Sequence, residues 1–118
     1  MLSINGPNEN RVMTVIVSGE LTREDYARLL PELEKILEKF ESLRFFIRLR
    51  DFEGFEAGAV WEDLKFDVKH SDQYGRSAIV GSNRWEKWAT QIANLFFSAE
   101  MKFFPEEDRE QGWVWVNS

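Results

Sequence analysis

Short apolar runs separated by turn residues mark the beginning of the chain. The β-branched run Val12–Ser18 is bounded by polar residues and glycines, which predicts a strand. A shorter strand is predicted over Leu2–Asn5, and the turn-forming residues Asn5–Asn8 would join the two. The chain therefore starts with two strands that are close enough in sequence to pair.

A helical pattern follows directly. Thr22 is placed to cap a helix, and Asp25 suits the positive first turn. Pro31 lies inside the pattern and predicts a kink, because it removes one backbone donor and crowds the preceding turn. Apolar residues at intervals of three and four predict the buried face of an amphipathic helix: Tyr26, Leu29, Leu30, Leu33, Ile36, Leu37 and Phe40.

Three further strands are predicted in the rest of the chain. They cover Leu43–Phe52, where apolar residues alternate with arginines, then Ser77–Val80 and Ala99–Phe104. The apolar run Ser77–Val80 is typical of a strand buried within a parallel sheet. Asp51–Gly58 is predicted to be a loop, and Gly75 to end the helix that follows this loop.

Helices are predicted between and after these strands. The first has one apolar side, made of Ala57, Val60, Trp61, Leu64 and Val68. Asn83 starts the second with a capping-box pattern. Pro105 and the acidic residues after it suit the first turn of a terminal helix, although Gly112 interrupts it and Trp113–Val116 alternates as a strand would.

This order of elements predicts one α/β domain over residues 1–118. Strands that alternate with helices favour a mostly parallel sheet, and the two initial strands add an antiparallel start. We therefore expect a mixed, mostly parallel sheet of about five strands with about four helices packed on it.

The amino-acid composition and net charge exclude several classes of function. Hydrophobic residues make up 43% of the chain and charged residues 31%, which is typical of a globular protein. A net charge of −6 argues against binding to nucleic acid and against strong attraction to an anionic membrane, leaving at most peripheral membrane contact. The absence of cysteine excludes disulfides and thiolate chemistry. No apolar run is long enough to span a bilayer and the first residues do not form a signal peptide, so a cytoplasmic location is the default expectation.

Reactive groups are scarce. His70 is the single histidine and adjoins Ser71 and Asp72, but neighbours in sequence do not easily adopt the geometry of a catalytic triad. A helix C-terminus, where a cation interacts well with the dipole, explains His70 more simply. A metal site would need Asp67 and Asp72 as well, and both have ordinary roles on a solvated face. We therefore predict no catalytic residue, no metal site and no cofactor.

An aromatic helix is the most informative feature of the second half. It carries Trp85 and Trp88 on one face, and such a helix could line an apolar pocket, dock on a partner or lie in a membrane interface. The alternative, which comes first for each tryptophan alone, is a face that packs on the core. The candidate ligand-binding residues are Trp61, Leu64, Trp85, Trp88, Ile92 and Phe96.

Several segments resemble the SpoIIAA-like family, which belongs to the STAS domains (sulfate transporters and anti-sigma factor antagonists). The segments that carry this resemblance occur in the family's order: Thr22–Tyr26, Pro31–Leu33, Trp61–Asp67, Lys69–His70, Ile79–Gly81 and Trp85–Trp88. The resemblance implies a mixed sheet with helices largely on one side, similar in shape to lipid-carrier domains of the CRAL-TRIO type. It also implies a protein suspected of binding apolar ligands or membranes.

One departure from the STAS pattern matters. Phosphoregulated STAS proteins carry a serine or threonine at the start of the helix after the central strand, where added charge switches partner binding. Here no serine or threonine occurs between Leu43 and His70, so that switch is chemically excluded.

Three hypotheses follow, in order of preference. The first is a non-catalytic module that binds an apolar small molecule or lipid. The second is a protein–protein regulatory domain without phosphorylation, whose partner is another protein or a second copy of this chain. The third is an enzyme that uses His70 as an acid–base group.

Overall fold

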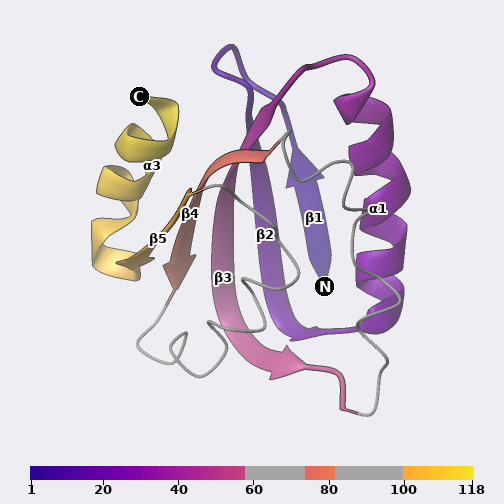
Figure 1. Cartoon of the computed structure of the whole chain (residues 1–118). Coiled ribbons are helices and arrows are strands. Elements are labelled where there is room, and N and C mark those ends of the chain that lie inside the picture. The colour runs from indigo at the N-terminus through magenta and orange to yellow at the C-terminus, as the bar shows by residue number, and fades with distance from the viewer. Residues whose placement is uncertain (58–73, 82–99) are drawn as a thin grey trace.

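The computed structural model describes residues 1–57, 74–81 and 100–118 (Figure 1). The strands form one sheet in the order β1-β2-β3-β4-β5. β1 (Leu2–Asn5) runs antiparallel to β2 (Val12–Leu21), whereas the other three neighbouring pairs are parallel. Those pairs bring in β3 (Leu43–Phe55), β4 (Tyr74–Gly81) and β5 (Glu100–Pro105). The prediction of a five-stranded mixed sheet in one α/β domain is confirmed.

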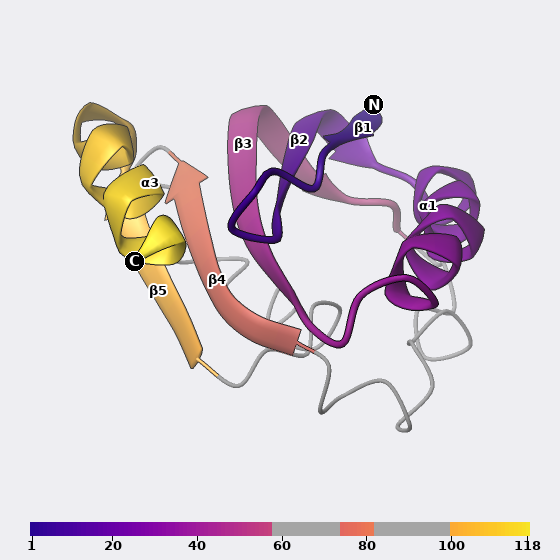
Figure 2. The ribbon, with the colours of Figure 1, turned by 90° about the horizontal axis from the view of Figure 1, so that it is seen from above.

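Two α-helices lie in the described part of the chain, not about four. α1 (Arg23–Leu37) connects β2 to β3, and α3 (Arg109–Asn117) follows β5 after the single 3₁₀ turn η4 (Glu106–Asp108). The two helices predicted around Trp61 and from Asn83 lie outside the described residues. Figure 2 shows α1 and α3 on opposite faces of the sheet, so these two helices do not meet the expectation of helices largely on one side.

The sheet separates two apolar clusters. Cross-strand neighbours Ile4, Val15, Ile47, Ile79 and Phe103 form one row across all five strands on the face that α1 covers. Tyr26, Leu29, Leu33 and Leu37 of α1 pack onto this face. The opposite face carries a smaller cluster with α3: Val12, Phe46, Ala78, Val80, Phe104 and Val116.

α1 begins where the sequence predicts. The Thr22 hydroxyl accepts a hydrogen bond from the Asp25 backbone N–H at 3.0 Å. The Asp25 carboxylate in turn accepts one from the Thr22 N–H at 3.4 Å. This reciprocal capping box satisfies two backbone donors that a helix start otherwise leaves open. The helix continues through Pro31, and the kink there stays a prediction.

Two predicted boundaries are wrong. The loop expected from Asp51 begins later, because β3 continues to Phe55. Register shifts around Gly19 in β2 let pairing resume beyond the irregularity, with Leu21 opposite Phe55. Gly75 does not end a helix but lies inside β4, where a Cβ atom would stand 3.2 Å from the Cγ of Arg44. Glycine there lets the side chain of the neighbouring strand approach the backbone closely.

The C-terminal segment is a helix, as predicted, rather than a strand. Gly112 is buried in α3 directly over Phe104, and a Cβ atom at this position would lie 3.0 Å from that ring. The glycine that made the sequence pattern ambiguous therefore lets the helix pack closely on β5.

Candidate functional site

The six predicted ligand-binding residues all lie outside the described residues, so their role stays a prediction: Trp61, Leu64, Trp85, Trp88, Ile92 and Phe96. His70 lies outside them as well. The candidate surfaces below are therefore built from the described residues.

The carboxyl ends of the parallel strands form the first candidate surface. In open α/β sheets, ligands bind outside these ends. Phe52 and Phe55 of β3 lie there with ring centroids 5.4 Å apart and ring planes at 85°, an edge-to-face pair. Both are partly buried against the α1-side core, as are Met101 and Phe103 of β5. The described residues thus offer an apolar, partly accessible set of side chains here and on β5.

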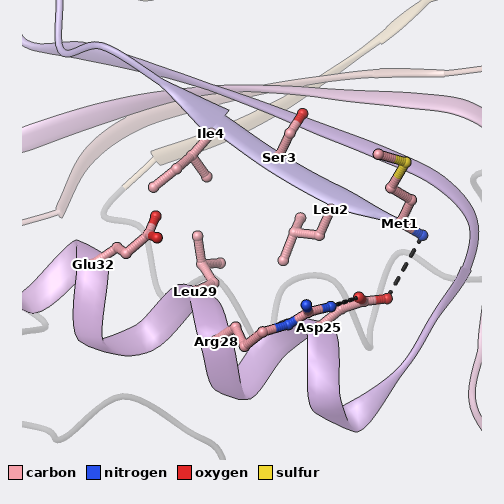
Figure 3. A pocket seen from close by; sticks show the side chains of 8 residues that line it. All are labelled: Met1, Leu2, Ser3, Ile4, Asp25, Arg28, Leu29 and Glu32. Carbon is pink, nitrogen blue, oxygen red and sulfur yellow. Dashed lines mark hydrogen bonds and ion pairs between the residues drawn. The ribbon is translucent and has the colours of Figure 1, made fainter.

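A second surface is a groove between β1 and α1 (Figure 3). Its volume is about 370 Å³. Leu2 and Ile4 point from the strand toward the helix, and Leu29 rises from α1 between them. The full lining is Met1, Leu2, Ser3, Ile4, Asp25, Arg28, Leu29 and Glu32.

Charge is unevenly distributed in this groove. The Asp25 carboxylate, 12% exposed, accepts a hydrogen bond from Arg28 at 2.8 Å and lies 3.6 Å from the Met1 α-amino group. Burial pushes the pKa of Asp25 upward, but hydrogen bonds from the Thr22 side chain, the Thr22 backbone and Arg28 outweigh it, and the pKa is lowered. Asp25 is thus held as an anion in a structural role at the helix start.

Arginines fix α3 on the other face. Arg44 donates to the backbone oxygens of Val116 and Ser118 at 3.1 and 2.7 Å, and Arg76 donates to the Trp115 oxygen at 3.1 Å. The Arg76 guanidinium also lies 5.2 Å from the Trp115 ring centroid. Cations at a helix C-terminus satisfy its open carbonyls and suit its dipole. These contacts are structural.

Arg48 and Glu106 form an ion pair between β3 and the turn before α3. The Arg48 side chain is 25% exposed, and its Nε is buried with no hydrogen-bond partner in the part of the chain that the structure describes. Sequence reasoning missed this pair and both α3 anchors. For Arg44 and Arg48 the signal was the alternation of arginines with apolar residues in Leu43–Phe52, which places these arginines on the face opposite the main core.

Over residues 1–57, 74–81 and 100–118, no group of three histidines, cysteines or carboxylates is placed to hold a metal ion. Burial raises the pKa of Tyr26, a core residue of α1. Among the same residues, no helix is long and apolar enough to cross a membrane.

Comparison with known proteins agrees with this architecture. A sequence model of the SpoIIAA-like family matches residues 12–117. The chain belongs to the SpoIIAA-like family. This SpoIIAA-like chain is also similar to the crystal structure of an uncharacterized protein from Shewanella loihica PV-4, of the DUF3478 family and with a SpoIIAA-like fold.

The likeness to the Shewanella protein extends over nearly all of both molecules. The two are 31% identical with a TM-score of 0.71, and the match covers 98% of this SpoIIAA-like chain and 92% of the other. No curated protein matches the chain. The resemblance inferred from sequence is therefore confirmed at the level of family and fold.

Proposed function

We propose that this SpoIIAA-like domain is a non-catalytic binding module for an apolar small molecule or acyl chain. The observation that carries the proposal is the Phe52–Phe55 pair at the carboxyl end of β3, packed against the core yet partly accessible. Apolar ligand sites are lined mainly by such aromatic and aliphatic groups. Met101 and Phe103 of β5 are partly buried against the same cluster. We propose the aromatic residues predicted from sequence, among them Trp85 and Trp88, as further contacts of the same ligand.

Fatty acids of increasing length provide the test. Octanoate, dodecanoate and hexadecanoate are titrated into the full chain while tryptophan fluorescence and thermal unfolding are recorded. A ligand at about a hundred times its Kd stabilises a fold by about 2.7 kcal/mol. For a domain of this size such a gain raises Tm by on the order of 10 °C. We expect the shift to grow with acyl length until the site is filled.

A pair of matched variants locates the site. Phe55→Gln should reduce the ligand-induced rise in Tm, because it introduces a polar group into the aromatic pair. Val114→Gln makes a similar apolar-to-polar change at a side chain of α3 that is 67% exposed, and should leave the rise unchanged. Unchanged fluorescence and Tm across all three acids would contradict the proposal, as would equal losses in the two variants.

A protein–protein regulatory role without phosphorylation is the second candidate. α3 favours it, because Trp113 and Val114 are 40% and 67% exposed on adjacent positions of one helix. A photo-crosslinking amino acid at position 114 should yield one discrete adduct in cells, and the same residue in place of the exposed Glu9 serves as the control. Recovery of monomer alone from both positions would reject this role for α3.

A further inference from the structure

β1 ends the sheet, and its outer side has a definite hydrogen-bonding pattern. The Met1 α-amino group donates to the Ser18 oxygen at 2.7 Å, and the Ser18 N–H donates to the Met1 oxygen at 2.9 Å. Such doubly bonded pairs alternate along an antiparallel ladder, so Ser3 is the next residue of β1 to bond β2. Leu2 and Ile4 consequently direct their N–H and C=O groups outward. No described strand pairs with this side of β1.

α1 lies beneath the position that another strand would take. In Figures 1 and 2 the helix lies beyond β1, on the side away from β2. A strand added to β1 would therefore run over α1 and along the groove described above. Leu2 and Ile4, both half-buried, would meet every second side chain of that strand, and the buried Leu29 lies beneath them (Figure 3). Backbone donors and acceptors are thus provided together with a groove that is lined by both apolar and charged side chains.

The groove also has an electrostatic preference. Arg28 and the Met1 α-amino group both lie at Asp25, so that carboxylate is neutralised. Glu32 lines the opposite end beside Ile4, is exposed, and takes part in no ion pair among the described residues. A basic side chain on the incoming strand would complement Glu32, and an acidic one would be repelled.

We propose that the outer edge of β1 binds an extended peptide segment of a partner protein as a sixth strand. Main-chain hydrogen bonds to Leu2 and Ile4 provide affinity, and alternating apolar side chains enter the groove. A Lys or Arg of the segment faces Glu32. Because β1 is four residues long, the segment needs only about four to six residues in extended form.

A second copy of this chain fits the same edge poorly. Two-fold pairing of β1 with another β1 would place the same patch of each copy against the other. Each α1 extends beyond its own β1, so the two helices would compete for the space beneath the joined edges. A single extended segment has no such obstacle. This inference is independent of the apolar ligand proposed above, because it concerns the outer edge of β1 and not the Phe52–Phe55 pair at the end of β3.

The probe is a displayed library of random octapeptides, selected on the full wild-type chain. We expect enriched peptides to alternate apolar and polar residues and to contain a basic residue at a fixed place. One enriched peptide is then synthesised in two N-methylated forms, methylated at odd or at even residues. Only one set of amides faces β1 in a strand, so one form should lose binding and the other keep it.

Variants of the chain provide the second readout. Ile4→Pro removes one outward N–H and keeps the ladder to β2, as proline does on edge strands, and should abolish binding while circular dichroism stays unchanged. Glu32→Lys should weaken binding about tenfold or more through like-charge repulsion. Glu9→Lys makes the same charge change on the exposed turn between β1 and β2 and should have less than about a twofold effect.

Four results would overturn the inference. They are a selection without enrichment, equal loss from both N-methylated forms, enriched peptides that bind Glu32→Lys as well as wild type, and a dimer in light scattering that Ile4→Pro dissociates. The N-methylated peptides act on the unmodified chain, so the inference stays testable even where a variant fails to fold. Failure of fatty-acid binding would leave all these outcomes unaffected.

Discussion

The two faces of one sheet hold their helices by different means. On the α1 face, thirteen described residues form a buried apolar cluster, whereas six form the cluster on the α3 face. α3 contributes one buried apolar side chain, Val116, to its cluster, whereas α1 contributes four, but α3 is also anchored by Arg44 and Arg76, which bond its last carbonyls. Burial scales with apolar area and is non-directional, while these hydrogen bonds depend on geometry.

That difference predicts which substitutions each face of the sheet tolerates. A tightly packed apolar face is destabilised when a buried side chain is made smaller, because the surrounding residues cannot close the cavity fully. On a face held by half-exposed charged groups, the loss of stability depends on which residue of an ion pair is substituted, because solvent screens the charge that remains. The following changes test this contrast.

Loss of volume on the α1 face should have the largest effect. Leu33, 3% exposed, packs from α1 into the main cluster. Leu33→Ala should lower the free energy of unfolding by about 2–5 kcal/mol. Val116→Ala removes fewer atoms from the smaller cluster and should cost less. Urea unfolding followed by circular dichroism compares the two, and equal costs would refute the contrast.

Overpacking at Gly112 of α3 should have the next largest effect. Gly112→Val places atoms where even a Cβ would lie 3.0 Å from the Phe104 ring, and should cost about 1–3 kcal/mol. Phe104→Leu in the same chain should restore part of the loss, because the two sites are in contact. Gln111→Val, on an exposed position of α3, is the control for residue type. A purely additive double variant would show that the contact does not limit packing.

A smaller, asymmetric effect is expected at the Arg48–Glu106 pair. Glu106→Ala leaves a largely buried guanidinium without its partner and should cost about 1 kcal/mol. Arg48→Met keeps the apolar stem and removes the charge, so its cost should be near zero. Thermal unfolding of the two variants ranks them. If Arg48→Met proved the more destabilising, the pair would have to be a net contributor to stability.

The same contrast explains how much the sequence could predict. Periodic apolar patterns identify α1, β2 and β3 correctly, since burial on one face imposes a regular spacing. Gly112 is ambiguous in the sequence and Gly75 is wrongly predicted to end a helix, because the role of each depends on a neighbour far away in sequence, Phe104 for Gly112 and Arg44 for Gly75.

The functional sites were equally hard to predict, because they too depend on residues that are distant in sequence. The groove at β1 arises from α1 extending beyond an edge strand, and no local pattern of Leu2–Asn5 shows where that helix lies. The arginine anchors of α3 likewise join strands to a helix that follows them by many residues. The candidates on the aromatic helices were chosen from local spacing alone and stay predictions.

The smallest effect concerns Asp25, whose carboxylate takes part in the capping box at the start of α1. Folding lowers the pKa of Asp25, so its carboxylate contributes stability that is fully present above the pKa of the unfolded chain, about 4. This contribution is lost as the pH falls through the lower pKa of the folded state. Asp25→Asn should therefore cost about 0.5–1 kcal/mol at neutral pH, and the difference from wild type should shrink below about pH 4.

Urea unfolding at neutral pH and near pH 3 measures this change. Glu24→Gln removes a carboxylate from the same first turn but breaks no capping hydrogen bond, so it should cost less at neutral pH than Asp25→Asn. A cost for Asp25→Asn that persists undiminished in acid would mean that the side-chain geometry of the capping box, rather than its charge, stabilises the start of α1. In that case α1 would depend on burial and neutral hydrogen bonds alone, and charge would distinguish only the α3 face.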